Sequence, residues 1–279
     1  MSTLMAFAPF DLFGSAGAGA GAQLLADAVR ELLADNRRER QPSRARAYQD
    51  QVRLKEFTFE TPEDYQQWPK RARQTVKQAL GKKEFLFWVG GNHLSVLPVL
   101  EELPKNSVVI QFDAHLDVYN LTGCTTEPSH GNFLLHAAGP LPPIIHVGGR
   151  DLFLPADHVR KHFRETIAAE EVAGSFDDVL RRLRTACRGR RVWLDIDCDV
   201  LDPAFFPATG QPLPFGLTPQ QLLRCLDAAW SERVAGVSLS EFEPVRDRGD
   251  QSLGLLVWLL EHLLLKRYED KSITSNEEE

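Results

Sequence analysis

A short run of acidic and basic side chains, Asp-Ala-His-Leu-Asp, occupies residues 113–117. It follows residues 108–112, an apolar segment without charges, which is typical of a strand buried in a parallel sheet. If the extended geometry continues, alternation turns Asp113, His115 and Asp117 toward one side. Carboxylates gathered in this way repel one another unless a cation lies between them. The other interpretation is a strand that ends in solvated charges, and the rest of the chain must decide.

A second acidic cluster follows another apolar segment, residues 191–194. Asp195, Asp197 and Asp199 share one face if the chain there is extended. Aspartate is depleted in strands, and an unpaired ionised carboxylate is costly to bury, so solubility alone explains this pattern poorly. Two separate clusters therefore predict a metal site.

A histidine follows a third apolar segment, residues 84–89. Gly90 and Gly91 precede His93, and glycines allow a crowded turn that aims the imidazole into a shared cleft. The charge of four carboxylates matches two divalent cations, and two imidazoles add nitrogen ligands. The predicted ligands are His93, Asp113, His115, Asp117, Asp197 and Asp199.

This carboxylate-rich set, without a thiolate, fits Mn²⁺ better than structural zinc. Two Mn²⁺ ions can share one water, lower its pKa and direct the resulting hydroxide at an electrophilic carbon. The sequence contains neither a P-loop nor a G-x-S-x-G elbow, so nucleotide phosphate chemistry and serine acyl transfer have little support. The residues thus predict hydrolysis without a side-chain nucleophile.

The elements that must position these residues alternate along the chain. This alternation predicts a three-layer α/β/α sandwich with a mostly parallel central sheet, in a single domain spanning residues 1–279. An acidic tail, from about residue 270 to 279, is expected to be frayed. Strands are predicted at residues 4–10, 84–89, 108–112, 144–147, 191–194 and 235–239, and helices at 23–35, 62–80 with a break near Pro69, 96–103, 176–184 and 252–268.

Composition excludes several classes of function. The net charge of −7 disfavours a binder of nucleic acid or of acidic membranes and suits a small cationic substrate. The four cysteines show no short paired spacing, which favours reduced thiols and a cytoplasmic protein. Residues 1–25 lack the basic start of a secretory signal, and the apolar stretch 253–265 is shorter than the roughly 20 residues that span a bilayer.

Two weaker motifs are better explained by structure than by function. Gly17, Gly19 and Ala22 imitate a dinucleotide fingerprint, but the extra residues 11–16 spoil the abrupt strand-to-helix turn, so tight packing is preferred. His158 and His162 have a spacing that can bind zinc, but nothing else in the sequence supports a site there. Exposed helix positions are the preferred interpretation of both histidines.

Taken in order, five motifs resemble the ureohydrolase family, which includes arginase, agmatinase and other guanidino hydrolases. They are Gly-Gly-Asn-His at 90–93, Asp-Ala-His-Leu-Asp at 113–117, Ser-His-Gly at 129–131, the segment 197–203, and Glu-Phe-Glu-Pro at 241–244. The resemblance covers most of the chain. It implies an arginase-like fold and a homotrimer or homohexamer that hydrolyses a guanidino compound to urea and an amine.

The resemblance also implies roles for individual residues. One Mn²⁺ would be held by His93, Asp113, Asp117 and Asp197, and the other by His115, Asp113, Asp197 and Asp199. A hydroxide bridging the ions would attack the guanidinium carbon. The implied catalytic residues are Asp117, which orients the hydroxide, His130, which transfers protons, and Glu241, which pairs with the guanidinium.

Departures from the family pattern leave alternatives open. Asn92 stands where the family usually has aspartate, and Asp195 where it has serine; such neighbours of ligands can change metal affinity or activity roughly 10–100-fold. Tyr119 and Phe153 occupy positions where arginases read the α-amino and α-carboxylate groups, which favours an agmatinase-like enzyme although Asp151 is kept. The alternatives are a non-catalytic structural or regulatory member and a formimino or acyl-amide hydrolase on the same fold.

Overall fold

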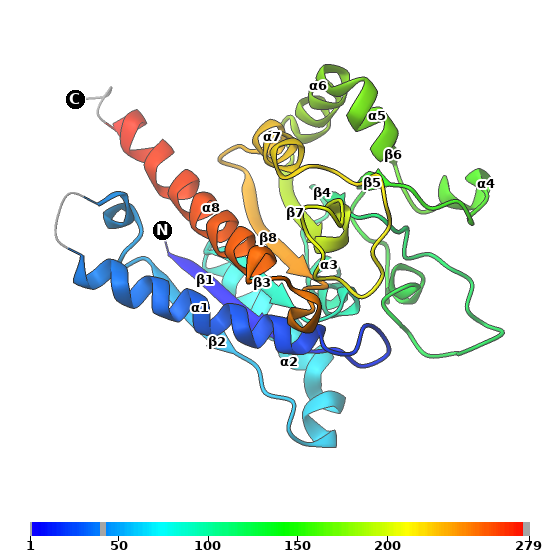
Figure 1. Cartoon of the computed structure of the whole chain (residues 1–279), viewed down its shortest axis with the longest axis horizontal. Helices are drawn as coiled ribbons and strands as arrows, with labels where there is room; N and C mark the ends of the chain where they lie inside the picture. Colours follow the sequence, from blue (N-terminus) through cyan, green and yellow to red (C-terminus); the bar gives the residue numbers. More distant parts are fainter. Residues whose placement is uncertain (1, 40–42, 276–279) are drawn as a thin grey trace.

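The central feature of the computed structural model, which describes residues 2–39 and 43–275, is one parallel sheet (Figure 1). Within these ranges, eight strands lie in the order β2-β1-β3-β8-β7-β4-β5-β6, and every neighbouring pair is parallel. The strands are β1 (Thr3–Ala8), β2 (Val52–Glu56), β3 (Phe85–Gly90), β4 (Ser107–Phe112), β5 (Ile144–Gly149), β6 (Glu165–Ala168), β7 (Arg191–Asp197) and β8 (Val234–Ser240).

Helices cover both faces of this sheet. They are α1 (Ala18–Arg38), α2 (Pro62–Gly81), α3 (Leu97–Leu100), α4 (Ala156–Val159), α5 (Ala169–Gly174), α6 (Phe176–Cys187), α7 (Pro219–Ala229) and α8 (Gln251–Ser275). Alternate residues of β1 enter different cores: Met5 and Phe7 belong to the core that includes α1 and α5 to α8, whereas Leu4 and Ala6 belong to the core that includes α2 and α3. The three-layer α/β/α sandwich predicted from the sequence is confirmed, and its sheet is parallel throughout.

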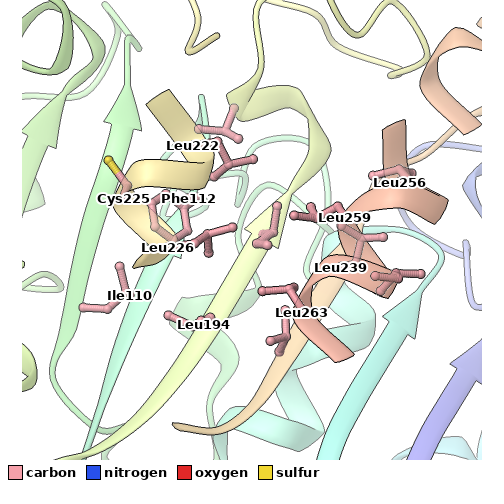
Figure 2. Close-up of a cluster of buried hydrophobic side chains, with 14 of the residues drawn as sticks. Ile110, Phe112, Leu194, Leu222, Cys225, Leu226, Leu239, Leu256, Leu259 and Leu263 are labelled. Atoms are coloured by element: carbon pink, nitrogen blue, oxygen red, sulfur yellow. The ribbon is translucent and has the colours of Figure 1, made fainter. Parts of the chain in front are cut away.

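Apolar side chains of α7 and α8 anchor the central strands (Figure 2). Burying each leucine-sized side chain stabilises the fold by about 1.5–3 kcal/mol. The helices therefore fix the strands whose carboxyl ends carry the predicted chemistry. The residues labelled there belong to one buried cluster: Leu222, Cys225 and Leu226 of α7, Leu256, Leu259 and Leu263 of α8, and Ile110, Phe112, Leu194 and Leu239 of the sheet.

Sequence patterns missed β2, β6, α5 and α7. The two strands lie at the edges of the sheet and are only partly buried, so neither has the uninterrupted apolar pattern of a central strand. The start of α7 does carry a readable signal. Thr218 and Gln221 form a capping box there, and Pro219 occupies a first-turn position.

The C-terminal helix extends beyond its predicted end. The backbone of α8 is helical through Ser275, beyond the predicted end at residue 268; residues 276–279, part of the tail expected to be frayed, lie outside the described ranges. Across the described residues, no helix has both the length and the hydropathy needed to span a bilayer.

Helix α2 is continuous through Pro69, where the sequence predicted a break. Two interactions compensate for the backbone hydrogen bond that proline cannot donate. At the start of the helix, Thr61 and Asp64 form a capping box. The preceding residue, Trp68, is buried against Phe10 and Phe57, with ring centroids at 5.7 and 5.1 Å. Tertiary packing therefore overrides the local preference for a kink.

Replacing Pro69 with alanine is expected to stabilise the protein, because an exposed helix-interior position gains a donor and loses a clash. The host–guest difference of about 3 kcal/mol is the upper limit. Pro62→Ala is the matched control, since proline is favourable at the first helical position. Urea unfolding followed by circular dichroism measures both variants. A Pro69→Ala protein no more stable than the control would contradict this account.

Candidate functional site

The predicted site residues lie at the carboxyl ends of four neighbouring strands. The sheet order places β3, β8, β7 and β4 side by side. Because all four strands are parallel, the loops that follow them meet at one edge of the sheet, which is where ligands bind in open α/β sheets. His93 follows β3, residues 113–117 follow β4, Asp197 ends β7, and Glu241 follows β8.

The turn after β3 is crowded, as the paired glycines predicted. A Cβ atom on Gly91 would lie 2.2 Å from the carbonyl oxygen of Phe10, so only glycine fits there. The next backbone amide, that of Asn92, donates to the same carbonyl at 2.9 Å, and the amide of His93 donates to Glu241 Oε1 at 2.8 Å. These bonds aim the His93 imidazole at the end of β4.

The loop after β4 gathers its side chains through a turn and not through an extended strand. Strand β4 ends at Phe112, and Asp117 adopts a positive φ of 51°, a strained conformation for aspartate. The prediction that alternation would align Asp113, His115 and Asp117 is therefore wrong in its geometry. Instead, the amide of His115 donates to Asp113 Oδ1 at 2.7 Å, which closes the turn and brings the side chains together.

The end of β7 also changes direction. Asp197 is its last residue, and a short 3₁₀ helix, Cys198–Val200, follows. The amide of Asp199 donates to Asp197 Oδ1 at 2.9 Å, and Asp199 Oδ1 accepts from the amide of Ala114 at 3.0 Å. Alternation along an extended chain predicted that Asp195 and Asp199 share one face. Because of this turn, Asp199 instead reaches the β4 loop, whereas Asp195 stays within the sheet.

Two potential ligand groups result, and they share Asp113. In the first, the ligand atoms of His93, Asp113 and Asp117 lie within 4.8 Å of one another. Asp197 Oδ2 adjoins this group, 3.2 Å from His93 Nδ1. The second group consists of Asp113, His115 and Asp199, with His115 Nδ1 2.8 Å from Asp199 Oδ2.

Burial makes this cluster electrostatically unfavourable on its own. Burial raises the pKa of Asp113 well above its ordinary value, and the charges of Asp117 and Asp199 raise it further. Burial likewise raises the pKa of Asp117 and, together with Asp199, that of Asp197. Burial alone would lower the pKa of His115, but its contact with Asp199 outweighs this effect and gives a pKa of about 9.

The donor set fits divalent metal ions. His93 Nδ1 and Asp113 Oδ2 are buried atoms without a hydrogen-bond partner among the described residues, and they lie 3.2 Å apart. A neutral imidazole nitrogen and a carboxylate oxygen facing each other are satisfied by a cation between them. Carboxylate oxygens with two imidazoles and no thiolate suit Mn²⁺ among the first-row metals.

The cluster opens into a cavity of about 500 Å³. His130 and Glu241, the other predicted catalytic residues, line it, and His130 Nδ1 lies 3.1 Å from Glu241 Oε1. Burial would lower the pKa of His130, but its hydrogen bond to Glu241 raises it above the ordinary value. Glu241 has a positive φ of 66°, so both it and Asp117 hold strained backbone conformations at the site.

Three features of the site were missed from the sequence. Phe13 and Ser15, in the loop after β1, line the cavity because β1 lies beside β3. Gln211 Nε2 lies 3.4 Å from His130 Nε2. Arg150 donates to backbone carbonyls that include those of Asp199 at 2.6 Å and Leu213 at 2.9 Å, and so ties two loops of the site together. The Gly-Gly-Arg run that ends β5 was the available signal for Arg150.

The two departures from the family pattern make different contacts. Asn92 Nδ2 donates to the carbonyl of Leu12 at 2.9 Å, which holds the loop after β1 over the cavity. An ionised aspartate could not donate this bond. Asp195 lies 3.0 Å from His93 Nε2, on the side of the imidazole opposite the carboxylate cluster. Both residues are fully buried.

The residues at the arginase-like specificity positions are already paired with one another. The Tyr119 hydroxyl donates to Asp151 Oδ2, and the amides of Phe153 and Leu154 donate to Asp151 Oδ1 at 2.6 and 3.0 Å. The Phe153 side chain is 80% exposed. Asp151 thus already accepts three hydrogen bonds from protein donors.

The weaker motifs do not form sites of their own. The amides of Gly17 and Gly19 donate to Asp11 Oδ2, so a carboxylate already occupies the start of α1, where a fingerprint would bind phosphate. His158 Nε2 lies 2.7 Å from the carbonyl of Val118. Packing explains the glycines, and a backbone contact accounts for His158.

Known proteins resemble this chain in both sequence and structure. An agmatinase of Serratia proteamaculans is 31% identical over 179 residues, which are 62% of this chain and 56% of that protein. The chain thus spans little more than half the length of this curated relative.

Solved structures share the fold. A hypothetical agmatinase from Burkholderia thailandensis has a TM-score of 0.79 at 22% identity, covering 97% of this chain and 87% of that one. Arginase from Bacillus subtilis has a TM-score of 0.77 at 20% identity, covering 95% and 98%. The sequence model of the arginase family matches residues 3–266. The family model thus matches nearly the whole chain, including the residues of both ligand groups, and the protein belongs to the arginase family.

Proposed function

We propose that this protein is a binuclear-manganese hydrolase that cleaves a guanidino compound into urea and an amine. The observation that carries the proposal is the pair of ligand groups sharing Asp113, whose members His115, Asp117 and Asp199 line the same cavity as Glu241 and His130. His93, Asp113, Asp117 and Asp197 would hold one ion, and His115, Asp113, Asp197 and Asp199 the other. Bound metal ions would supply Lewis acidity and an activated water.

Glu241 and His130 act on the substrate and on protons. The contacts of Glu241 with the His93 amide and with His130 both use Oε1, which leaves Oε2 for the guanidinium of a substrate. A charge-assisted hydrogen bond of this kind favours a guanidinium over a neutral amide. His130, anchored through Nδ1, can carry a proton at Nε2 toward the leaving amine. Asp117 orients the attacking water.

An amine-terminated substrate such as agmatine suits the cavity better than arginine. Asp151, the acidic residue that would pair with an α-amino group, already accepts from Tyr119 and two backbone amides. The name of the agmatinase relative favours the same substrate class. A cytoplasmic location and an assembly of three or six copies stay predictions.

Mn²⁺ is expected to stabilise the protein, because it neutralises buried carboxylates only in the folded state. At a concentration one hundred times the dissociation constant, each site contributes about 2.7 kcal/mol. Thermal unfolding with Mn²⁺ or with a chelator measures the effect. Asp113→Asn should lose most of the Mn²⁺-dependent rise in unfolding temperature. The control is Asp247→Asn, the same change at a residue outside both ligand groups that accepts from the Ser252 amide, and it should keep this rise.

Mn²⁺-dependent urea release should accompany this binding. Asp113→Asn or Asp197→Asn is expected to lower it at least about a hundredfold, because both residues would contact both ions. A screen over agmatine, arginine, guanidinobutyrate, guanidinopropionate and guanidine tests the activity. No urea from any of them, with Mn²⁺ bound, would favour a non-catalytic member. Release of formamide or acetate from other substrates would favour the amide-hydrolase alternative.

Substrate preference should depend on Tyr119. Tyr119→Asn frees Asp151 and is expected to raise kcat/KM for arginine relative to agmatine by about tenfold, the value of one charged hydrogen bond of about 1.4 kcal/mol. Leu121→Ala is the control, because it enlarges the same cavity without touching Asp151. Arginine as the better substrate of the wild type would contradict the proposed preference.

A further inference from the structure

The ring edge of His93 that points away from the predicted metal ligands contacts a further carboxylate. Asp195 Oδ2 lies 3.0 Å from His93 Nε2. Both side chains are buried, with exposed fractions of 0% for Asp195 and 1% for His93. Asp195 has no part in the roles proposed above, yet a carboxylate enclosed in the sheet is costly unless it is held by donors.

Neighbouring strands provide these donors. Asp195 pairs in register with Gln111 of β4 and with Ser238 of β8. Gln111 Nε2 donates to Asp195 Oδ2 at 3.2 Å, and the Ser238 hydroxyl donates to Oδ1. Because both donors belong to rigid central strands, the carboxylate is fixed in place beneath His93.

The direction of each hydrogen bond in this chain is determined by chemistry. Trp193 Nε1, which can only donate, contacts Ser238 Oγ at 2.9 Å. Ser238 accepts that bond, so its own hydrogen is available to Asp195. An ionised carboxylate can only accept. The hydrogen between Asp195 and His93 must therefore sit on His93 Nε2.

The other nitrogen of His93, Nδ1, faces the carboxylate cluster. Nδ1 lies 2.9 Å from Asp117 Oδ2 and 3.2 Å from both Asp113 Oδ2 and Asp197 Oδ2. It has no hydrogen-bond partner among the described residues. With the proton fixed on Nε2, Nδ1 is the nitrogen of His93 that faces the ligand group and can bind a metal ion.

We propose that Asp195 is a positioning residue that fixes His93 in the tautomer whose Nδ1 binds the metal ion of the His93 group. The proposal rests on the proposed metal centre. It also gives the serine-to-aspartate departure a function. A serine hydroxyl can both donate and accept, so it leaves the tautomer of its partner open, whereas a carboxylate dictates it.

The first test is calorimetric titration of the metal-free full-length protein with Mn²⁺. The wild type is expected to bind two ions. Asp195→Asn preserves volume, but its amide can turn an N–H toward His93 Nε2 and favour the wrong tautomer. It should weaken one ion about 10–100-fold and leave the other unchanged, because only the His93 group depends on Asp195. A general structural defect would weaken both ions.

Two further variants sharpen the result. His115→Asn is the reciprocal control and should weaken the other ion. Ser238→Ala keeps the Asp195 carboxylate but removes one of its hydrogen-bond donors, so it should cause a smaller loss of Mn²⁺ affinity at the His93 group. This variant tests the same hydrogen-bond chain if Asp195→Asn folds poorly. Equal Mn²⁺ affinities in the wild type, Asp195→Asn and Ser238→Ala would overturn the proposal.

A direct readout comes from ¹⁵N-histidine NMR of the protein loaded with Cd²⁺, a diamagnetic probe. His93, assigned by its loss in His93→Asn, is expected to carry its proton on Nε2; a proton on Nδ1 would overturn the assignment.

Urea release is measured separately. Two bound Mn²⁺ ions with urea release, but without the Asp195 effect, would refute only this inference, whereas a wild type that binds no Mn²⁺ would refute the metal centre and the inference together.

Discussion

Repulsion among buried carboxylates is the constraint on which the rest of this structure depends. Asp113, Asp117, Asp197 and Asp199 converge where four parallel strands end, and each is almost fully enclosed. Water cannot dissipate their charge there, so imidazoles and backbone N–H donors must offset it, and the proposed metal ions would supply further positive charge. The apolar layers supplied by α7 and α8 hold the strands in place against this repulsion (Figure 2).

Around the carboxylates, the protein uses few flexible groups. Backbone amides of His115, Asp199 and Ala114 donate hydrogen bonds to carboxylates of the cluster. Asp117 and Glu241 have positive φ angles, and the packing of the surrounding sheet must hold these strained conformations in place. This preorganisation means that ligand atoms are gathered by the fold and do not have to be collected by the metal. Such rigidity suits a site that must place an electrophilic carbon accurately.

The two departures from the family pattern, Asn92 and Asp195, also change which charged groups lie near the site. Asn92 lacks the carboxylate that the family usually places beside His93, and Asp195 adds one on the opposite side of the imidazole. The side-chain amide of Asn92 holds the carbonyl of Leu12, away from the His93 imidazole. Read as isolated changes, both suggested a loss of function. In three dimensions each makes its own hydrogen-bonded contact, Asn92 with Leu12 and Asp195 with His93.

The sequence by itself determined the layered fold and the identity of the clustered residues, because buried parallel strands give continuous apolar runs and charged residues at their ends are easily recognised. Only the tertiary structure decided that β8 lies between β3 and β7, that turns and not alternation gather the side chains, and that Asp195 lies 3.0 Å from His93 Nε2. The reason is physical: local patterns report which face a residue occupies, whereas strand order and contacts between residues 102 positions apart arise only when distant segments pack together.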